Sequence, residues 1–391
     1  MTFRAARPRR VTMLVRNAFT NDTRVEREAA SLVAAGYRVT VVAEAGQGLS
    51  AHEQRDGSTV IRVARRGPRL PGLRFVAHLL RLALAIRRTR PDILHAHDTD
   101  ALQVIGPIGR RLDVPVVFDS HELWLGRSAR GRSRLYHRVA QAYYGWVERR
   151  FVPRAAAVIV ANPPVAAELE RRYGRGDVVP VPNYPSESGA VPARDLRSLP
   201  NCAEIPADAP IVIYVGAMTT ERGIEQLVDA MVEVPEARLV FLGGGGLEPA
   251  IRDRVAWRGL TDRTHFAGMV PSGDVVPYAA SATVGILSTM PTNLNNRLAL
   301  PNKIFQYMAA AIPVVASDYP QIREVVEGSG CGLLVDPTDT DGLSAAIRTY
   351  TGDPARAARD GASGRRAVTE RYHWAAAAEN LLTVYRRVEQ A

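Results

Sequence analysis

Short apolar runs alternate with amphipathic segments along almost the whole chain. The first such unit has an apolar run at 11–15, a helical pattern from about residue 23 that Gly36 ends, and a second apolar run at 39–43. Short apolar runs separated by helical patterns are typical of parallel strands joined by crossover helices. The sequence therefore predicts that the chain opens with a right-handed βαβ unit.

The same alternation continues to about residue 183 and starts again at residue 211. In the first stretch we expect strands at 59–63, 93–97, 114–118, 157–160 and 178–182, and helices at 72–90, 101–112, 133–150 and 163–173. In the second we expect strands at 211–215, 239–242, 265–268, 284–287 and 314–317, with closing helices at 341–351, 354–371 and 373–390. This pattern predicts an α/β protein with two Rossmann-like, doubly wound domains that face each other across a cleft.

The expected domains are residues 1–190 and 211–371, joined by a linker at 191–210. Five prolines fall between residues 185 and 210 among small and charged residues, which is typical of a connecting segment. Residues 372–391 are expected to form a closing helix that packs back on the N-terminal domain. A chain of 391 residues with 46% hydrophobic residues can give each domain its own core.

Cysteine usage and hydropathy further restrict the class of protein and the compartment in which it is expected. The only cysteines, Cys202 and Cys331, form no disulfide framework and no metal-binding spacing, so a reducing cytoplasm is expected. No signal peptide is recognised, and no run of 18 apolar residues occurs.

The net charge of +10 is unevenly spread. Residues 1–190 hold 31 basic and 17 acidic residues, whereas residues 191–391 hold 19 and 23. Nine arginines and no acid lie between Asp56 and Asp92. A basic amphipathic helix within 65–90 can lie on an anionic membrane surface or bind an acidic acceptor; the alternative is an ordinary packing helix with a solvated face. No nucleic-acid partner is expected, because the arginines form no recognised motif.

The segment 283–318 holds the strongest candidate chemistry. It is predicted to contain a strand, a loop at 288–301, a helix and another strand, so the loop and helix start lie at a strand's carboxyl end, where α/β sheets bind ligands. Asn302, Lys303 and Gln306 fall within about one helical turn. Lys303 is the only lysine beside 49 arginines, which favours a specific phosphate contact; codon bias is the alternative.

Other motifs were weighed against structural explanations. His95, His97 and the Asp98-Thr99-Asp100 triplet suggest a metal site, but no third histidine or carboxylate cluster supports it, so no metal is expected and polar residues at a strand end explain them. His121 follows a predicted strand and is a candidate catalytic residue. The glycines at 243–246 lack the full dinucleotide-binding spacing. Arg222 precedes a helix, where a cation can neutralise a pyrophosphate.

Together these residues resemble the retaining glycosyltransferases of family 4, which have the GT-B fold. The resemblance is carried by the segments VRNAFTNDTRVEREAASLVAAGYRVTVVA, DILHAHD, VVFDSHE, VPN, IYVGAMTTERGIEQLVDAM, HFAGMV, LPNKIFQYMAAAIPVVASD and EVVEGSGCGLLVDP. It implies transfer of a sugar from a nucleotide diphosphate donor to a hydroxyl acceptor, with no cofactor and no essential metal. The alternative is a catalytically silent nucleotide-sugar-binding or scaffold protein with the same fold.

The resemblance also implies roles for particular residues. Arg222 and Lys303 would bind the donor phosphates together with the helix start at Asn302, and His121 would lie beside the donor sugar. No residue of the protein is expected to act as a nucleophile.

Two positions depart from the family's pattern. The family's Glu-x7-Glu pair is replaced by Leu298 and Gln306. Contacts to the donor sugar are therefore expected from Asn295, Asn296 or Asn302, and Gln306 would bind the ribose. The remaining expected contacts are Gly216, Phe266, Met269 and Val270 on the donor side, and the loop of Asn21, Asp22 and Thr23 as the acceptor or phosphate loop.

Overall fold

The computed structural model describes residues 7–20, 22–67, 70–126, 133–186 and 192–390. The chain forms two compact units, one of Met1–Asn183 with Ala377–Ala391 and one of Tyr184–Ala376. Within the described ranges, no helix combines the length and the hydropathy needed to cross a membrane.

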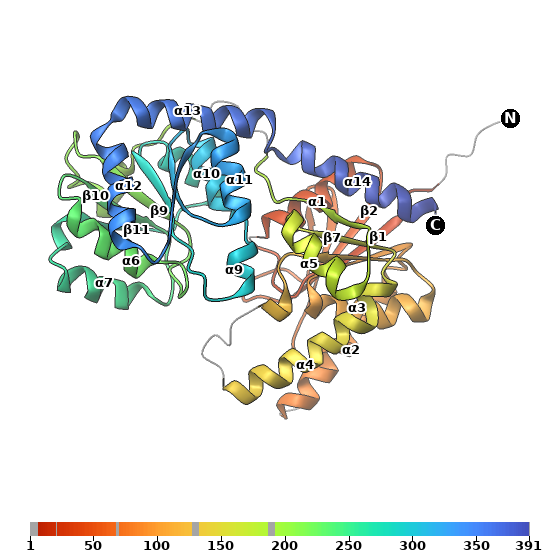
Figure 1. Ribbon diagram of the computed structural model, residues 1–391. Helices are drawn as coiled ribbons and strands as arrows, with labels where there is room; N and C mark the ends of the chain where they lie inside the picture. Colours follow the sequence, from red (N-terminus) through yellow and green to blue (C-terminus); the bar gives the residue numbers. More distant parts are fainter. Residues whose placement is uncertain (1–6, 21, 68–69, 127–132, 187–191, 391) are drawn as a thin grey trace. The chain divides into compact units, whose positions relative to one another are not determined.

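The first unit contains an eight-stranded sheet in the order β3-β4-β2-β1-β5-β6-β7-β8, of which Figure 1 labels β1, β2 and β7. Its strands are β1 (Arg10–Leu14), β2 (Arg38–Glu44), β3 (His52–Arg55), β4 (Ser58–Val63), β5 (Ile93–His97), β6 (Val116–Ser120), β7 (Ala157–Val160) and β8 (Val178–Pro180). Its helices are α1 (Thr23–Ala34), α2 (Pro71–Arg88), α3 (Thr99–Leu112), α4 (Arg134–Phe151), α5 (Pro163–Tyr173) and most of α14 (Trp374–Gln390). All neighbouring strands are parallel except β3 and β4.

The β3-β4 hairpin is a feature that the sequence analysis missed. Its turn is Asp56-Gly57, and both residues have positive φ, at 47° and 77°. An Asp-Gly pair is a strong hairpin signal, because a two-residue turn of this kind needs left-handed backbone. The signal was obscured because β3 is a polar edge strand without an alternating apolar pattern.

The second unit contains a six-stranded parallel sheet in the order β11-β10-β9-β12-β13-β14. Its strands are β9 (Ile211–Val215), β10 (Arg238–Leu242), β11 (Thr264–Gly268), β12 (Val284–Leu287), β13 (Val314–Ser317) and β14 (Gly332–Val335). Its helices are α6 (Ile224–Ala230), α7 (Glu248–Trp257), α8 (Val275–Ala279), α9 (Leu294–Leu298), α10 (Asn302–Ala309), α11 (Pro320–Ser329), α12 (Thr340–Gly352) and α13 (Pro354–Glu370) (Figure 1). The strand order reverses between β9 and β12, so the loops after these two strands flank a topological switch point.

The boundary between the units differs from the expected one. The expected linker at 191–210 belongs to the second unit, where Leu196 and Cys202 are fully buried in its core. The segment contains two short 3-10 turns, Leu196–Ser198 and Pro200–Cys202, and is not an extended connection. The chain passes to the second unit at Tyr184 and returns to the first at Ala377, within α14.

One glycine fixes the helix α10 on the second sheet. A Cβ at Gly285 in β12 would lie 2.4 Å from the ring of Tyr307, so only glycine lets that ring lie across the strand. The Tyr307 hydroxyl accepts a hydrogen bond from the N–H of Val215 at 2.9 Å and donates to the carbonyl of Ile286 at 3.1 Å. Because Tyr307 is about one turn after Lys303, these contacts also fix the start of α10 relative to the switch point.

Candidate functional site

Two loops meet at the switch point of the second unit. The hydroxyl of Ser288, just after β12, donates to the carbonyls of Arg222 at 3.0 Å and Gly223 at 3.1 Å, in the loop after β9. Gly223 has φ of 63°, and a Cβ there would lie 1.9 Å from the Ser288 carbonyl oxygen. The position therefore requires glycine, and the backbone that carries Arg222 is tied to the loop that leads to α10.

Lys303 lies in the first turn of α10, close to Arg222. Its ammonium is 3.8 Å from the centre of the Tyr214 ring, a cation–π contact, and a Cβ on Gly216 would be 3.7 Å from the same nitrogen. Burial and the positive charge of Arg222 lower the pKa of Lys303 to about 7. Neither side chain forms an ion pair or hydrogen bond with another described residue. Two neighbouring basic side chains that have no acidic partner among the described residues favour the binding of an anion here.

The helix start at Asn302 strengthens this site. Pro301 precedes it, and no side chain caps the helix, so N–H groups of the first turn remain available to an anion. The side-chain amides of Asn302 and Gln306 make no hydrogen bond with other described residues, and Asn302 is exposed. The structure thus places Arg222, Lys303, Asn302 and Gln306 where a diphosphate and its attached sugars could meet free donors.

The sequence analysis predicted a long loop at 288–301, whereas the structure shows that this segment contains the short helix α9. Asn293 caps this helix by accepting from the N–H of Asn296 at 2.9 Å. The amide of Asn296 is buried and donates to the carbonyl of Met290 at 3.0 Å and the hydroxyl of Thr292 at 3.2 Å. The side-chain amide of Asn296 therefore stabilises the conformation of this loop. Asn295 is also within α9, and Leu298 ends it.

The residues expected near the donor base differ in their exposure. Phe266 is buried and stacks on Phe241, with ring centres 5.2 Å apart. The guanidinium of Arg252 lies over the Phe266 ring, 3.8 Å from its centre. Val270 packs against the core of the unit. Met269 is 85% exposed and lies beside Gly244. Of these expected contacts, Met269 offers the most open side chain.

The glycine run has a structural role that its sequence spacing did not reveal. A Cβ on Gly243 would lie 2.1 Å from the carbonyl oxygen of Gly216, and one on Gly245 would lie 2.4 Å from that of Met218. The run after β10 therefore packs directly on the loop after β9 and helps to fix Gly216 beside the Lys303 ammonium.

In the first unit, His121 belongs to a buried network of charges around Asp119. Its Nε2 is 2.8 Å from a carboxylate oxygen of Asp119, and its backbone N–H donates to Asp98 at 3.0 Å. Arg24 donates two hydrogen bonds to Asp119, at 2.7 and 2.8 Å. The Nδ1 of His97 is 3.2 Å from both Asp119 and His121. Asp119 is therefore shared by three side chains.

These charges shift one another's protonation. Burial alone would lower the pKa of His121, but the charges of Asp119 and Asp98 outweigh it and raise that pKa to about 10. Burial alone would raise the pKa of Asp119, but Arg24 and His121 hold it well below its usual range. His121 is thus a cation at neutral pH, held against an ionised carboxylate.

Asp98 shows backbone strain beside this network. Its φ of 65° and ψ of 168° lie in a region that residues other than glycine rarely adopt. The strained residue both precedes α3 and accepts the His121 N–H. Strain of this kind is concentrated at functional sites, which supports the prediction that His121 has a functional role.

The sequence analysis was wrong that no carboxylate cluster accompanies the histidines. Glu28, His95, His97 and Asp119 are buried, with possible ligand atoms within 4.8 Å of one another. However, Arg24 already contacts Glu28 at 3.1 Å and Asp119 at 2.7 Å. A metal ion would have to displace this guanidinium, so the groups fit a charge network better than a metal centre.

The sequence contained a pattern that could have indicated the burial of Arg24 and Glu28. Both lie on the buried face of α1, at the helical spacing of its apolar residues. Charged residues on the apolar face of a helix indicate buried ion pairs.

The expected phosphate loop of the first unit is only partly described. Asp22 accepts from the N–H of Val25 at 3.3 Å and from the amide of Asn17 at 2.8 Å, so it caps α1, which begins at Thr23. Asn21 lies outside the described residues. A phosphate contact here stays a prediction.

Comparison with known proteins places this geometry in a family. Residues 22–184 match the model described as Glycosyltransferase Family 4, and residues 209–353 match Glycosyl transferases group 1. Alpha-D-kanosaminyltransferase of Streptomyces kanamyceticus is 26% identical over 79% of this chain and 81% of its own. Alpha-maltose-1-phosphate synthase of Mycolicibacterium smegmatis is 32% identical over 62% of this chain and 66% of its own.

Solved structures agree on the fold. Sucrose-phosphate synthase from Thermosynechococcus elongatus has a TM-score of 0.82 at 23% identity, covering 98% of this chain and 99% of that one. Anabaena HepE in complex with UDP-glucose has a TM-score of 0.72 at 17% identity, covering 96% and 99%. Two α/β domains with sheets of this topology have the GT-B fold, as the sequence predicted. The chain belongs to glycosyltransferase family 4.

Proposed function

We propose that this glycosyltransferase takes its sugar from a nucleoside diphosphate donor and transfers it to a hydroxyl acceptor with retained anomeric configuration. The observation that carries the proposal is the pair of unpaired cations, Arg222 and Lys303, beside the free helix start of α10. The HepE structures contain UDP or UDP-glucose, and those ligands support the same class of donor here.

The reaction makes one main demand on the protein. Cleavage of the glycosyl–phosphate bond passes through an oxocarbenium-like state, and negative charge builds on the departing diphosphate. Arg222, Lys303 and the helix start supply fixed positive partners for that charge. The charge can therefore be balanced by side chains alone, which is why we propose that catalysis needs neither a metal ion nor a cofactor.

The donor site can be tested by calorimetric titration of the purified protein with UDP, GDP, TDP and ADP in a chelating buffer. We expect one diphosphate to bind and Arg222→Ala to weaken it by about 10- to 100-fold, because a hydrogen bond to a charged group contributes about 1.5–3 kcal/mol. Arg366→Ala is the matched control, since Arg366 is exposed and its one side-chain hydrogen bond within the described part of the chain is to Ser363. Equal affinity in both variants, or no diphosphate binding in the parent, would contradict the proposal.

We further propose that the first unit associates with an anionic membrane surface through residues 65–90, although residues 68 and 69 are outside the described ranges. Four large apolar side chains of α2 are more than half exposed: Leu73, Val76, Leu80 and Leu84. The same helix also exposes four arginines: Arg74, Arg81, Arg87 and Arg88.

A second helix, α4, also exposes an apolar stripe, which includes Leu135, Val139 and Trp146. Both helices pack on α3. Exposed apolar stripes among arginines are typical of interfacial helices.

Sedimentation with vesicles that contain anionic lipid tests this association. Leu73→Ser, Val76→Ser and Leu80→Ser combined are expected to weaken binding by at least about tenfold, because burying one such side chain contributes about 1.5–3 kcal/mol. Trp257→Ser removes a side chain that is 72% exposed in the second unit and should change nothing. Unaltered sedimentation of the triple variant would contradict this part of the proposal.

A further inference from the structure

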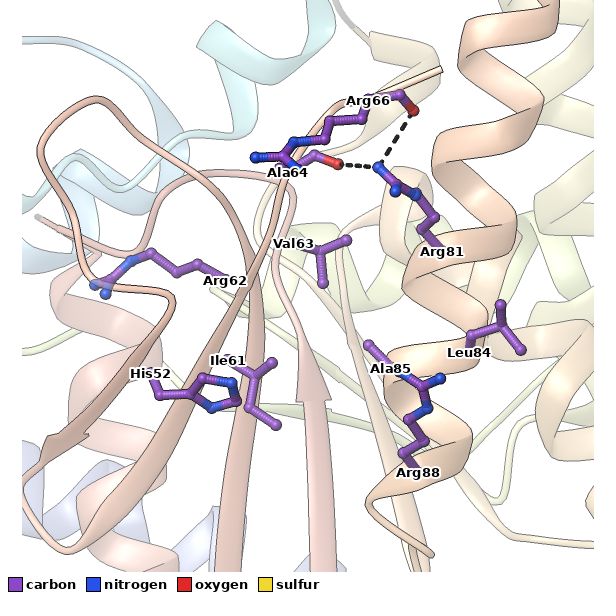
Figure 2. A pocket seen from close by; sticks show the side chains of 10 residues that line it. All are labelled: His52, Ile61, Arg62, Val63, Ala64, Arg66, Arg81, Leu84, Ala85 and Arg88. Carbon is purple, nitrogen blue, oxygen red and sulfur yellow. Dashed lines mark hydrogen bonds between the residues drawn. The ribbon is translucent and has the colours of Figure 1, made fainter. Parts of the chain in front are cut away.

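A pocket of about 570 Å³ lies between α2 and the edge strands of the first sheet. Figure 2 shows its lining: His52, Ile61, Arg62, Val63, Ala64, Arg66, Arg81, Leu84, Ala85 and Arg88. The volume is in the range of small-molecule sites. Four arginines and no acidic residue contribute to the lining, so the pocket suits an anion.

The four arginines are not equivalent. Arg62 is buried and already neutralised, because it pairs with Glu53 at 2.7 Å and donates to the carbonyls of Ala18 and Ser50 at 3.0 Å. It therefore forms part of the pocket wall. Arg66, Arg81 and Arg88 have no acidic partner among the described residues.

Arg81 is positioned loosely, with most of its donors free. One of its nitrogens makes long contacts to the carbonyls of Ala64 at 3.4 Å and Arg66 at 3.5 Å, which Figure 2 shows as dashed lines. Contacts of this length are weak, and a guanidinium has five N–H donors. Arg88 lies seven residues further along α2, which is about two helical turns and places it on the same face, about 10 Å away.

The pocket is continuous with the exposed apolar stripe of α2. Leu84 lines the pocket and is itself 52% exposed, and Leu80, one turn earlier, is 60% exposed. An anionic group held by the arginines would thus have apolar side chains beside it. A ligand with a phosphate at one end and a hydrocarbon part at the other fits both features.

We propose that this pocket is a binding site for a phosphate group, held by Arg66, Arg81 and Arg88, and that the phosphate belongs to an acidic lipid head group. The proposal deepens the membrane association proposed above and is independent of the donor site, which lies in the other unit. It turns a diffuse attraction between an arginine-rich helix and an anionic surface into recognition of one head group at a time.

The test compares two pairs of substitutions that remove the same charge from the same helix. Arg81→Gln with Arg88→Gln removes two pocket arginines, whereas Arg74→Gln with Arg87→Gln removes two exposed arginines that do not line the pocket. Each protein is sedimented with vesicles of phosphatidylcholine alone or mixed with phosphatidylglycerol, and is titrated with glycerol 1-phosphate. Circular dichroism and thermal unfolding, measured in parallel, check that each variant is folded.

We expect the pocket pair to weaken binding to the phosphatidylglycerol vesicles by about tenfold or more beyond the loss in the control pair, because charge-assisted hydrogen bonds are lost as well as charge. Glycerol 1-phosphate bound by the parent and lost only in the pocket pair would support the phosphate site, and failure of the vesicles to bind would then identify a soluble ligand in place of a lipid. Equal losses of affinity in the two pairs of substitutions would overturn the proposal of a phosphate-binding pocket. An absence of binding to both the vesicles and glycerol 1-phosphate would also overturn it.

Discussion

Replacing Lys303 by alanine or methionine is expected to lower the turnover number by about 100- to 1,000-fold while the chain stays folded. The ammonium lies 3.8 Å from the Tyr214 ring and beside Arg222, where charge would build on the departing diphosphate. Removing one fixed donor from such a position typically costs about 2.7–4 kcal/mol of transition-state stabilisation. If Lys303 reflects codon usage alone, turnover will remain near that of the parent.

The protonation of Lys303 gives a second measurement that does not depend on turnover. Its pKa of about 7 means that, at pH 8, most unliganded molecules carry a neutral amine. A bound diphosphate favours the charged form, so its binding should take up a proton. Calorimetry in two buffers of different ionisation enthalpy should show this uptake in the parent and not in Lys303→Met. A buffer-independent enthalpy in the parent would contradict it.

The same shift has a consequence for stability. The pKa of Lys303 in the folded protein lies below its ordinary 10.5, so the unfolded chain binds more protons between about pH 7 and 10.5. Below pH 7, burial of the charged lysine lowers the free energy of unfolding by its full amount. This loss disappears as the pH rises toward 10.5. Lys303→Met should therefore stabilise the unliganded protein at neutral pH while it impairs catalysis.

Replacing Asp119 by asparagine is expected to lower the free energy of unfolding of the first unit by about 3–5 kcal/mol, because an amide removes the nearest counter-charge of the buried Arg24 and of His121. Urea unfolding, followed by a probe in that unit, measures the loss. Asp177→Asn is the matched control: Asp177 is 53% exposed and pairs with Arg175, so its loss should stay below about 1 kcal/mol. Similar losses in the two variants would contradict a buried network.

The pH dependence of the first unit follows from His121. Its folded pKa of about 10 lies above its ordinary 6.5, so the imidazolium favours the folded state. This contribution is complete below about pH 6.5 and is lost as the pH rises through 10. Asp119→Asn should reduce that dependence, because the carboxylate that holds the proton on His121 is gone.

The sequence predicted most strands, the two-sheet architecture and the positions of Arg222 and Lys303 beside helix starts, because local sequence patterns mark each of them. Apolar runs mark buried strands, and the positions of both cations beside helix starts follow from chain order alone. The Asp119 network could not be predicted in this way. Arg24 and Asp119 are separated by 95 residues, and hydrophobic periodicity does not report which distant partner neutralises a buried charge. Similarly, the prolines at 191–210 favoured a linker, because proline content does not show that Leu196 and Cys202 pack in the core of the second unit.

Because the chain returns to the first unit at Ala377, the direction of synthesis determines which unit can be completed first. Tyr385 is fully buried there, and its hydroxyl meets the Nδ1 of His95 at 2.8 Å across 290 residues of sequence. During synthesis, every residue of the second unit emerges from the ribosome before this tyrosine does. The unit that is translated first is thus the last to be completed, and a chain that is released before Tyr385 is added would have a complete second unit and an incomplete first unit.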